Sequence, residues 1–404
     1  MQIFTNEVTV PEACLPLAAA APEDTLMVDI ETTGLNPVTS HLYLIGCVFR
    51  ANGQWLIRQY LAEDPSEEVM ILLAFSELAG HFTTLMHFNG ERFDLPYLRH
   101  RFSHHHLPCP FEGCRSVDLY QDLRRLRRLL NLEHMNQKSL EGFLHVGRDD
   151  QMSGGELIAV YERYSLTRSP EDLYLLRIHN QEDLSGMPQL LRLYSYRAFL
   201  ASPAPYLENA AVESARVQTE DADEPSESLL SEDAGKHLQA GSRLIKEAGE
   251  PLSENVYESL QLSVQLPQLP EFPVPVRAEV PGAGLTLSGQ TARLDLALCH
   301  GEAKHFFSNY RDYYYLPVED AVYHKSAARF VDPRFREPAR PDNCCVKKTG
   351  VFLPQPEGLY TPVFSRYYHD PLEWFEYDEA AGLSEDEARR LFTAWMASFM
   401  IEPA

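Results

Sequence analysis

The ten residues from 25 to 34 constrain the fold most strongly, because they place two carboxylates on an otherwise apolar strand. The stretch TLMVDIETTG begins with the apolar residues 26–28, continues through Asp29 and Glu31, and ends in a Thr-Thr-Gly turn. Side chains at positions i and i+2 of a strand point to the same side, so Asp29 and Glu31 project together. Two such carboxylates repel each other and are costly to bury, which favours a divalent cation beside them. The alternative is an exposed acidic turn.

Two further acids and a histidine follow at positions that can join this pair. Asp94 ends the segment HFNGERFD and lies in the first turn of a helix predicted for residues 92–102, where the helix dipole alone also favours a carboxylate. His179 and Asp183 lie in a helix predicted for residues 170–200, four residues apart and therefore on one helix face. If the four acids converge without enough positive charge, at least one of them should have a raised pKa.

The order D-x-E, then D, then H-x-x-x-D resembles that of the DEDD-type exonucleases in the RNase H-like superfamily. The phrases FNGERFDLPYL, SVDLYQDLRRL and HNQEDLSGM are similar to those of the YprB-type branch, and the resemblance covers roughly residues 20–200. It implies a metal-dependent exonuclease that acts 3′→5′ on single-stranded or unpaired ends of DNA or RNA, in DNA repair or RNA processing. A helicase or another repair protein is a candidate partner.

The same resemblance implies roles for individual residues. Two divalent ions, Mg²⁺ or Mn²⁺, would be held by Asp29, Glu31, Asp94 and Asp183. His179 would orient or deprotonate the attacking water, since its ordinary pKa of about 6.5 suits that task. The terminal nucleotide is expected to contact Thr32, Thr33 and Leu35, which follow the first two acids. Asn89 is a further candidate for substrate binding, and the alternative for it is a turn residue or helix cap.

Four arginines within five residues form the strongest basic cluster of an acidic chain. They lie in a helix predicted for residues 118–130, and Arg124, Arg125 and Arg128 are candidates for holding a phosphate backbone. The alternative is a solvated helix face paired with Glu133 or Asp122. The net charge of −24 argues against a protein that coats nucleic acid non-specifically, but it does not exclude an enzyme that grips a few phosphates.

The sequence predicts an α/β RNase H-like domain at 1–200, an acidic linker at 201–254 and a β-rich α+β domain at 255–404. In the first domain, apolar runs predict strands that form a mixed sheet with flanking helices, and Asn52-Gly53 marks a hairpin turn. The predicted strands are residues 25–29, 42–49, 55–61 and 83–87, and a helix is predicted at 66–80. The linker is acidic and has few large apolar residues.

In the second domain, alternating apolar residues predict strands, and Ser384 with Glu387 forms a capping box for a C-terminal helix. A helix is also predicted at 319–330 and a loop at 332–358. The aromatic segment 306–316 has two interpretations. Its rings form a core, or they stack bases with help from nearby lysines at 325, 347 and 348.

Composition and cysteine content predict a cytoplasmic protein that does not bind membranes. Hydrophobic residues make up 44% of the chain, and no apolar run approaches the roughly 18–20 residues of a membrane span. The seven cysteines are widely scattered, which suits free thiols in a reducing compartment. The rival to the enzyme hypothesis is a non-catalytic RNase H-like module that binds nucleic acid or a repair partner.

Overall fold

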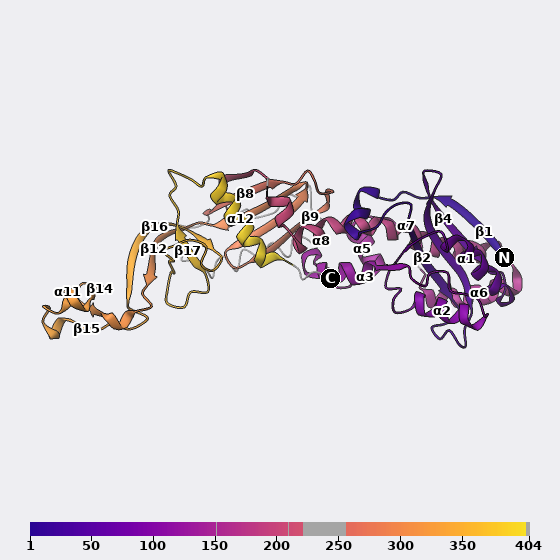
Figure 1. The fold of residues 1–404 in the computed structure, drawn as a ribbon, viewed down its shortest axis with the longest axis horizontal. Helices are drawn as coiled ribbons and strands as arrows, with labels where there is room; N and C mark the ends of the chain where they lie inside the picture. Colours follow the sequence, from indigo (N-terminus) through magenta and orange to yellow (C-terminus); the bar gives the residue numbers. More distant parts are fainter. Residues whose placement is uncertain (151, 209, 221–255, 401–404) are drawn as a thin grey trace. The chain divides into compact units, whose positions relative to one another are not determined.

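The computed structural model describes residues 1–150, 152–208, 210–220 and 256–400. The chain forms two compact units (Figure 1). The first contains residues 1–201 and 269–275, and the second contains residues 202–268 and 276–400. Each unit has its own sheets.

A six-stranded mixed sheet with the strand order β1-β4-β3-β2-β5-β6 forms the centre of the first unit. The strand that carries Asp29 and Glu31, β2, pairs antiparallel with β3 and parallel with β5, so it lies inside the sheet. Positive φ angles at Asn52 and Gly53 form the predicted tight turn between β3 and β4. The strands are β1 (Gln2–Glu7), β2 (Thr25–Thr32), β3 (Leu42–Ala51), β4 (Gln54–Leu61), β5 (Thr84–His87) and β6 (Arg115–Asp118).

The predicted strands at 25–29, 42–49, 55–61 and 83–87 are confirmed, whereas β1 and β6 were not predicted. Both are edge strands of this sheet. β1 alternates between half-buried and exposed residues, and β6 has only four residues. Neither therefore contains the apolar run by which a buried strand is recognised.

Helices pack on both faces of this sheet. On one face, Cys47 and Phe49 of β3 join a core formed with α1 and α2. On the other face, Tyr43 stacks on Tyr161 of α6 with ring centroids 4.2 Å apart. The main helices are α1 (Glu68–Ala79), α2 (Asp94–His104), α5 (Gln137–Phe143), α6 (Gly154–Thr167), α7 (Pro170–Gly186) and α8 (Tyr194–Ala201).

Two of the predicted helices are interrupted. The predicted helix at 118–130 consists of α3 (Leu119–Leu123), the short 3₁₀ turn η3 (Arg124–Leu126) and α4 (Arg127–Leu130). Like charges three and four residues apart on a helix repel, which disfavours a regular helix through the arginine cluster. The predicted helix at 170–200 is interrupted by η4 (Met187–Leu193), where Pro188 cannot donate a backbone hydrogen bond.

The second unit is rich in antiparallel strands. A five-stranded sheet has the order β7-β8-β11-β10-β9, and two smaller sheets have the orders β12-β16-β17 and β14-β13-β15. The helix α12 (Glu385–Phe399) begins at the predicted capping box. The strands are β7 (Val212–Glu220), β8 (Val256–Gln265), β9 (Phe272–Val280), β10 (Ala283–Gly289), β11 (Thr291–Ala297), β12 (Cys299–Phe306), β13 (Tyr313–Leu316), β14 (Ala321–His324), β15 (Glu337–Pro338), β16 (Cys345–Gln355) and β17 (Glu373–Glu376).

Three segments of the second unit differ from their predicted structure. The strand β7 lies inside the predicted acidic linker, and residues 221–254 of that linker lie outside the described residues. The predicted helix at 319–330 contains the strand β14 and only a short helix, α11 (Lys325–Ala328). The predicted loop at 332–358 contains the long strand β16, whose first half is polar and exposed. Pairing with β12 places β16 in the sheet, although its own sequence lacks alternation.

Candidate active site

The strand β2 positions Asp29 and Glu31 on one side of the sheet. Its residues Leu26, Val28 and Ile30 are buried in the core with α1 and α2. Because successive side chains of a strand alternate, Asp29 and Glu31 point to the opposite face, where α7 packs. The two acids of the strand thus lie on one side, as the spacing D-x-E predicted, and they face α7.

A glycine allows α7 to approach this face closely. A Cβ atom added at Gly46 of β3 would lie 2.3 Å from Oδ1 of Asn180 and 2.4 Å from Leu184, so only glycine fits there. Gly46 pairs with Asp29 across the β2–β3 ladder. Asn180 therefore reaches the first acid and donates from Nδ2 to Oδ2 of Asp29 at 2.8 Å. Asn180 was not among the predicted site residues, although it lies between His179 and Asp183 in the sequence of α7.

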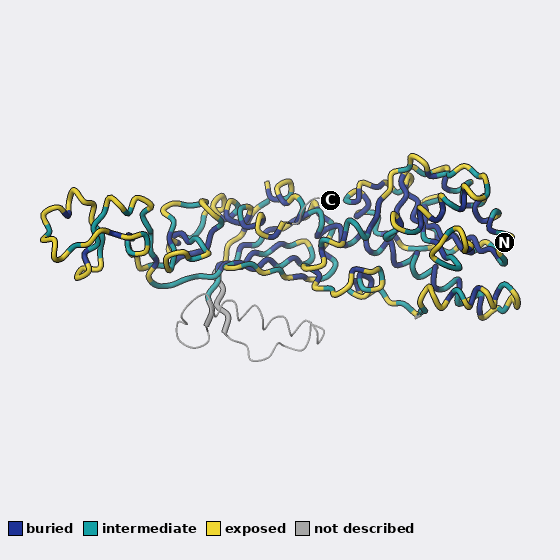
Figure 2. The backbone as a smooth tube through the Cα atoms, turned by 90° about the horizontal axis from the view of Figure 1, so that it is seen from below, coloured by how far each residue is buried: buried dark blue, intermediate teal, exposed yellow. Residues whose placement is uncertain are grey.

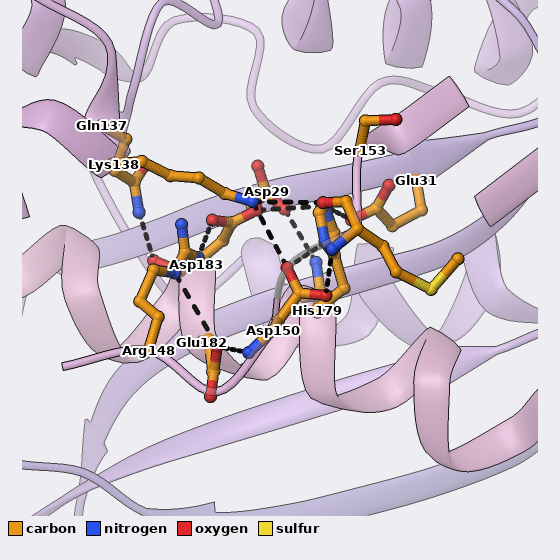
Figure 3. Close-up of polar contacts among 12 residues, drawn as sticks. Asp29, Glu31, Gln137, Lys138, Arg148, Asp150, Ser153, His179, Glu182 and Asp183 are labelled. Atoms are coloured by element: carbon orange, nitrogen blue, oxygen red, sulfur yellow. Dashed lines mark hydrogen bonds and ion pairs between the residues drawn. The ribbon is translucent and has the colours of Figure 1, made fainter. Parts of the chain in front are cut away.

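His179 lies between two of the predicted acids (Figure 3). Its Nε2 is 3.7 Å from Oε1 of Glu31 and 3.6 Å from Oδ2 of Asp183. Glu31, His179 and Asp183 each offer one ligand atom, and these three atoms lie within 4.8 Å of one another. On the other edge of the ring, Nδ1 is 2.7 Å from Oδ2 of Asp150. A proton on Nδ1 shared with Asp150 leaves the Nε2 lone pair facing the two acids.

The acids of the site repel one another, as their convergence predicted. Burial, together with repulsion by Asp183, raises the pKa of Asp29 and of Glu31 well above their ordinary values. Burial also raises the pKa of Asp94 to about 7, although the backbone N–H groups of Asp94 and Ile30 lower it. The negative charge of the site is therefore not balanced by the nearby side chains, and a cation would stabilise the ionised acids.

The segment between α5 and α6 brings two unpredicted side chains to the site (Figure 3). Asp150 contacts His179, and Arg148 forms an ion pair with Asp183. Nη1 of Arg148 also lies 3.3 Å from Oε2 of Glu141. The side chain of Glu182 accepts hydrogen bonds at 2.9 Å from the backbone N–H groups of residues 149 and 150, which fixes this segment to α7.

Sequence reasoning missed Arg148 and Asp150 because their segment belongs to no regular element. The available signal was the short polar run GRDD, which follows a helix and contains one cation and two acids. Such a run is also typical of a solvated loop.

The predicted nucleotide contacts lie in two turns. In the turn after β2, Thr32 donates to the carbonyl of Gly34 at 2.9 Å, and Oγ1 of Thr33 accepts from the N–H of His41 at 2.8 Å. The side chain of Leu35 is 83% exposed. In the turn after β5, Asn89 has a φ of 60°, and its Oδ1 is buried without a hydrogen-bond partner in the described part of the chain.

The arginine cluster lines a pocket of about 500 Å³ that also includes Tyr120 and His134. Arg124, Arg125 and Arg127 line it, whereas Arg128 does not. Oδ1 of Asp118 accepts hydrogen bonds from the N–H groups of Asn89, Tyr120 and Gln121, which connects the turn of Asn89 with the start of α3. Of the two proposed acidic partners, Glu133 lines the pocket, and Asp122 lies 3.3 Å from Arg197.

The fold and the comparison with known families agree. Residues 26–195 match a family model described as the RNase_H superfamily, over less than half of the chain. With its mixed sheet and helices on both faces, the first unit is an RNase H-like domain, as the sequence predicted. The predicted β-rich C-terminal region is confirmed as a set of antiparallel sheets. The YprB-type likeness stays a prediction.

Solved structures show only distant likeness. The family B DNA polymerase of Pyrobaculum calidifontis is 15% identical with a TM-score of 0.34, over 45% of this chain and 25% of the polymerase. Exonuclease I of E. coli in complex with a dT13 oligonucleotide is 14% identical with a TM-score of 0.27, over 65% of this chain and 55% of the exonuclease. Brucella melitensis NrnC bound to pGG is 16% identical with a TM-score of 0.23, over 44% of this chain and 80% of NrnC.

This chain thus spans a quarter of the polymerase and about half of the exonuclease. Likenesses at these TM-scores carry no argument about activity. No curated protein matches the sequence. None of the helices in the described ranges is long and apolar enough to span a bilayer.

Proposed function

We propose that this chain is a metal-dependent nuclease, and within that class a 3′→5′ exonuclease of single-stranded or unpaired ends of DNA or RNA. One observation carries the proposal. On an RNase H-like sheet, Glu31, His179 and Asp183 place ligand atoms within 4.8 Å of one another. Asp29 and Asp94 lie close enough to Asp183 for it to raise their pKa values. This combination of fold and side chains supports phosphodiester hydrolysis. The polarity rests on the resemblance alone.

The side chains fit divalent cations. Carboxylate oxygens are the ligands that Mg²⁺ and Mn²⁺ prefer, and the raised pKa values of Asp29 and Glu31 indicate uncompensated negative charge. We assign the binding of two such ions to Asp29, Glu31, Asp94 and Asp183. When bound, the ions supply stabilisation of the negative charge that develops on the phosphate.

The protein's own groups then position and move protons. His179 can accept a proton from the attacking water at Nε2, because its Nδ1 side is held by Asp150 at 2.7 Å. The charge of Asp150 stabilises the protonated ring that results. Asn180 holds Asp29 through a 2.8 Å hydrogen bond, and Arg148 holds Asp183 through an ion pair. We assign orientation of the acids to Asn180 and Arg148.

We assign substrate contacts to three places around these acids. Leu35 is exposed in the turn after β2 and can pack against the terminal nucleotide, beside Thr32 and Thr33. We assign Asn89, in the turn after β5, to contact with a base or a sugar hydroxyl. The pocket with Arg124 and Arg125 suits a phosphate, because guanidinium groups bind phosphate oxygens in pairs. Arg128 lies outside the pocket lining and would act by charge alone. A helicase or another repair protein stays a candidate partner.

The test uses single-stranded DNA and RNA labelled at either end, incubated with the protein in Mn²⁺ or in EDTA. The proposal predicts that a 5′-labelled strand shortens to a ladder in Mn²⁺ and stays intact in EDTA. A 3′-labelled strand should release its labelled terminal nucleotide at the start of the reaction. Binding of either strand without any shortening would contradict the enzyme and favour the non-catalytic module. A ladder that develops only on 3′-labelled strands would contradict the polarity.

A further inference from the structure

The ends of β12 and β16 and the segment that joins them form a small substructure of their own, here named the aromatic–basic module and defined as residues 304–348. It contains the sheet β14-β13-β15 and the helix α11. The strands β12 and β16 pair from Cys299–Phe352 to Phe306–Cys345, and the module continues from the far end of this hairpin (Figure 1).

The aromatic residues of the module do not form a core. Nine Phe and Tyr residues lie between positions 306 and 335, and none of them is buried. The buried side chains of the module are Leu316, Ala328, Ala339 and Cys344, and in Figure 2 this end of the tube is mostly exposed or intermediate. The interpretation of segment 306–316 as an aromatic core is therefore wrong. Phe330 is 81% exposed and Phe335 is 53% exposed, and large apolar rings left exposed within one short segment are candidates for contact with a ligand.

The module is also basic, although the chain is acidic. It contains nine Lys and Arg residues against six Asp and Glu residues, whereas the whole chain has a net charge of −24. In the described part of the protein, Lys325, Arg329 and Arg336 form no ion pair with an acid. Their positive charges are thus available to an anionic partner.

These three cations lie over aromatic rings of the module. The Arg329 guanidinium is 4.5 Å from the centre of the Phe330 ring. Lys325 and Arg336 both lie over Tyr314, at 5.5 Å and 4.6 Å from the ring centre. Each of these rings therefore has a cation beside it, so a base and its phosphate can each find a partner there.

We propose that the aromatic–basic module binds a single strand of nucleic acid, with its cations at the phosphates and its rings stacked on unpaired bases. This inference rests on the proposed nuclease function and adds a second contact for the same substrate. Charge complementarity selects a polyanion, because a basic surface on an acidic protein is the place where phosphates meet the least repulsion. The exposed rings select a single strand, because the bases of a duplex are already stacked inside it.

Binding is measured on the full chain in EDTA, which prevents cleavage, by fluorescence anisotropy of a labelled oligothymidylate of about 20 nucleotides. The double variant Phe330→Ala with Phe335→Ala removes rings, and Lys325→Gln with Arg329→Gln removes charges. Each should weaken binding by roughly tenfold or more. The charge variant should also reduce the slope of log K against log salt by roughly 1.4, since each lost phosphate contact to a single strand contributes about 0.7.

A matched control removes an exposed ring elsewhere. Tyr174 is 60% exposed on α7, so Tyr174→Ala should bind the oligothymidylate as the wild type does. Circular dichroism and thermal unfolding verify that each variant is folded. Wild-type affinity in both double variants would overturn the proposal, and equal competition by a duplex of the same length would overturn the single-strand assignment.

Cleavage of a pentanucleotide in Mn²⁺ separates this inference from the proposed function. Both double variants should cleave it at the wild-type rate, because a short strand can be held by the catalytic unit alone. A protein that binds the long strand through the module but cleaves nothing would contradict the nuclease. If both variants cleave the pentanucleotide and also bind the long strand as the wild type does, the binding role of the module is overturned and the proposed nuclease function is not.

Discussion

Replacing Asp94 by Asn should stabilise the metal-free protein, and the gain should grow as the pH rises. The physical reason is that burial raises the pKa of Asp94 from 3.8 to about 7. Between these values the native state binds more protons than the unfolded state, so the free energy of unfolding of the wild type falls as the pH increases. The loss is complete above pH 7 and persists there. Asn keeps an oxygen that can accept from the N–H of Ile30, and it carries no charge.

The size of the effect follows from the two pKa values. A shift from 3.8 to about 7 corresponds to roughly 4 kcal/mol at pH 8 and to roughly 1–2 kcal/mol at pH 5, where Asp94 is still protonated in the native state but already ionised in the unfolded state. The gain from Asp94→Asn should therefore increase by roughly 2–3 kcal/mol between pH 5 and pH 8. Neighbouring acids also titrate in this range, so the comparison is made between variant and wild type at each pH.

The assay is urea unfolding in EDTA at pH 5, 6.5 and 8. Unfolding is monitored by hydrogen exchange and mass spectrometry of peptides from β3 (Leu42–Ala51). These peptides report on the first unit only, because β3 lies inside its sheet. The matched control is Glu91→Gln, which neutralises an exposed acid three residues before Asp94 and should give no such gain. If wild type and Asp94→Asn lose stability in parallel from pH 5 to pH 8, the charge repulsion inferred at this site is absent.

Three further predictions concern the same acids and the histidine. His179→Ala should lower the rate of strand shortening by about 10²–10⁴-fold, as expected for loss of a general base, and an unchanged pH–rate profile would place the base elsewhere. Asp150→Asn should lower kcat by roughly tenfold or more with little change in KM, because it acts through the orientation of His179, and Asp150→Glu should restore part of kcat; a change in KM alone would contradict this role. A divalent ion at a hundredfold excess over its Kd should stabilise the wild type by about 2.7 kcal/mol and Asp29→Asn much less, and equal shifts in melting temperature would place the ion away from β2.

The predicted site residues were readable from the sequence because local geometry fixes their relations. Asp29 and Glu31 share a side by the alternation of a strand, and His179 and Asp183 share a face by the turn of a helix. Burial of residues 26, 28 and 30 then decides which face the acids occupy. These relations follow from the local geometry of one strand or one helix and do not depend on which other elements pack against it.

The residues that orient the acids and His179 could not be predicted from local geometry. Asp150 and Arg148 lie in a segment without periodicity, and its position depends on hydrogen bonds to Glu182, more than 30 residues later in the chain. Asn180 is polar within a helix, and its role follows only from the close approach that Gly46 permits. The strands β1, β6 and β16 were missed for a related reason, since their partner strands supply the pairing that their own sequences do not indicate.

The central claim is tested most directly by the nuclease activity of Asp29→Asn beside the wild type. The substitution removes one charge from β2 and preserves the shape of the side chain and its place beside Asn180, so the variant should fold and stay monodisperse. Both proteins are incubated with a 5′-labelled single strand in Mn²⁺ at the same concentration, after thermal unfolding has verified that each is folded. We expect the wild type to shorten the strand stepwise and Asp29→Asn to leave it intact. Shortening by the folded variant at the wild-type rate would contradict the assignment of this carboxylate cluster as the catalytic metal site.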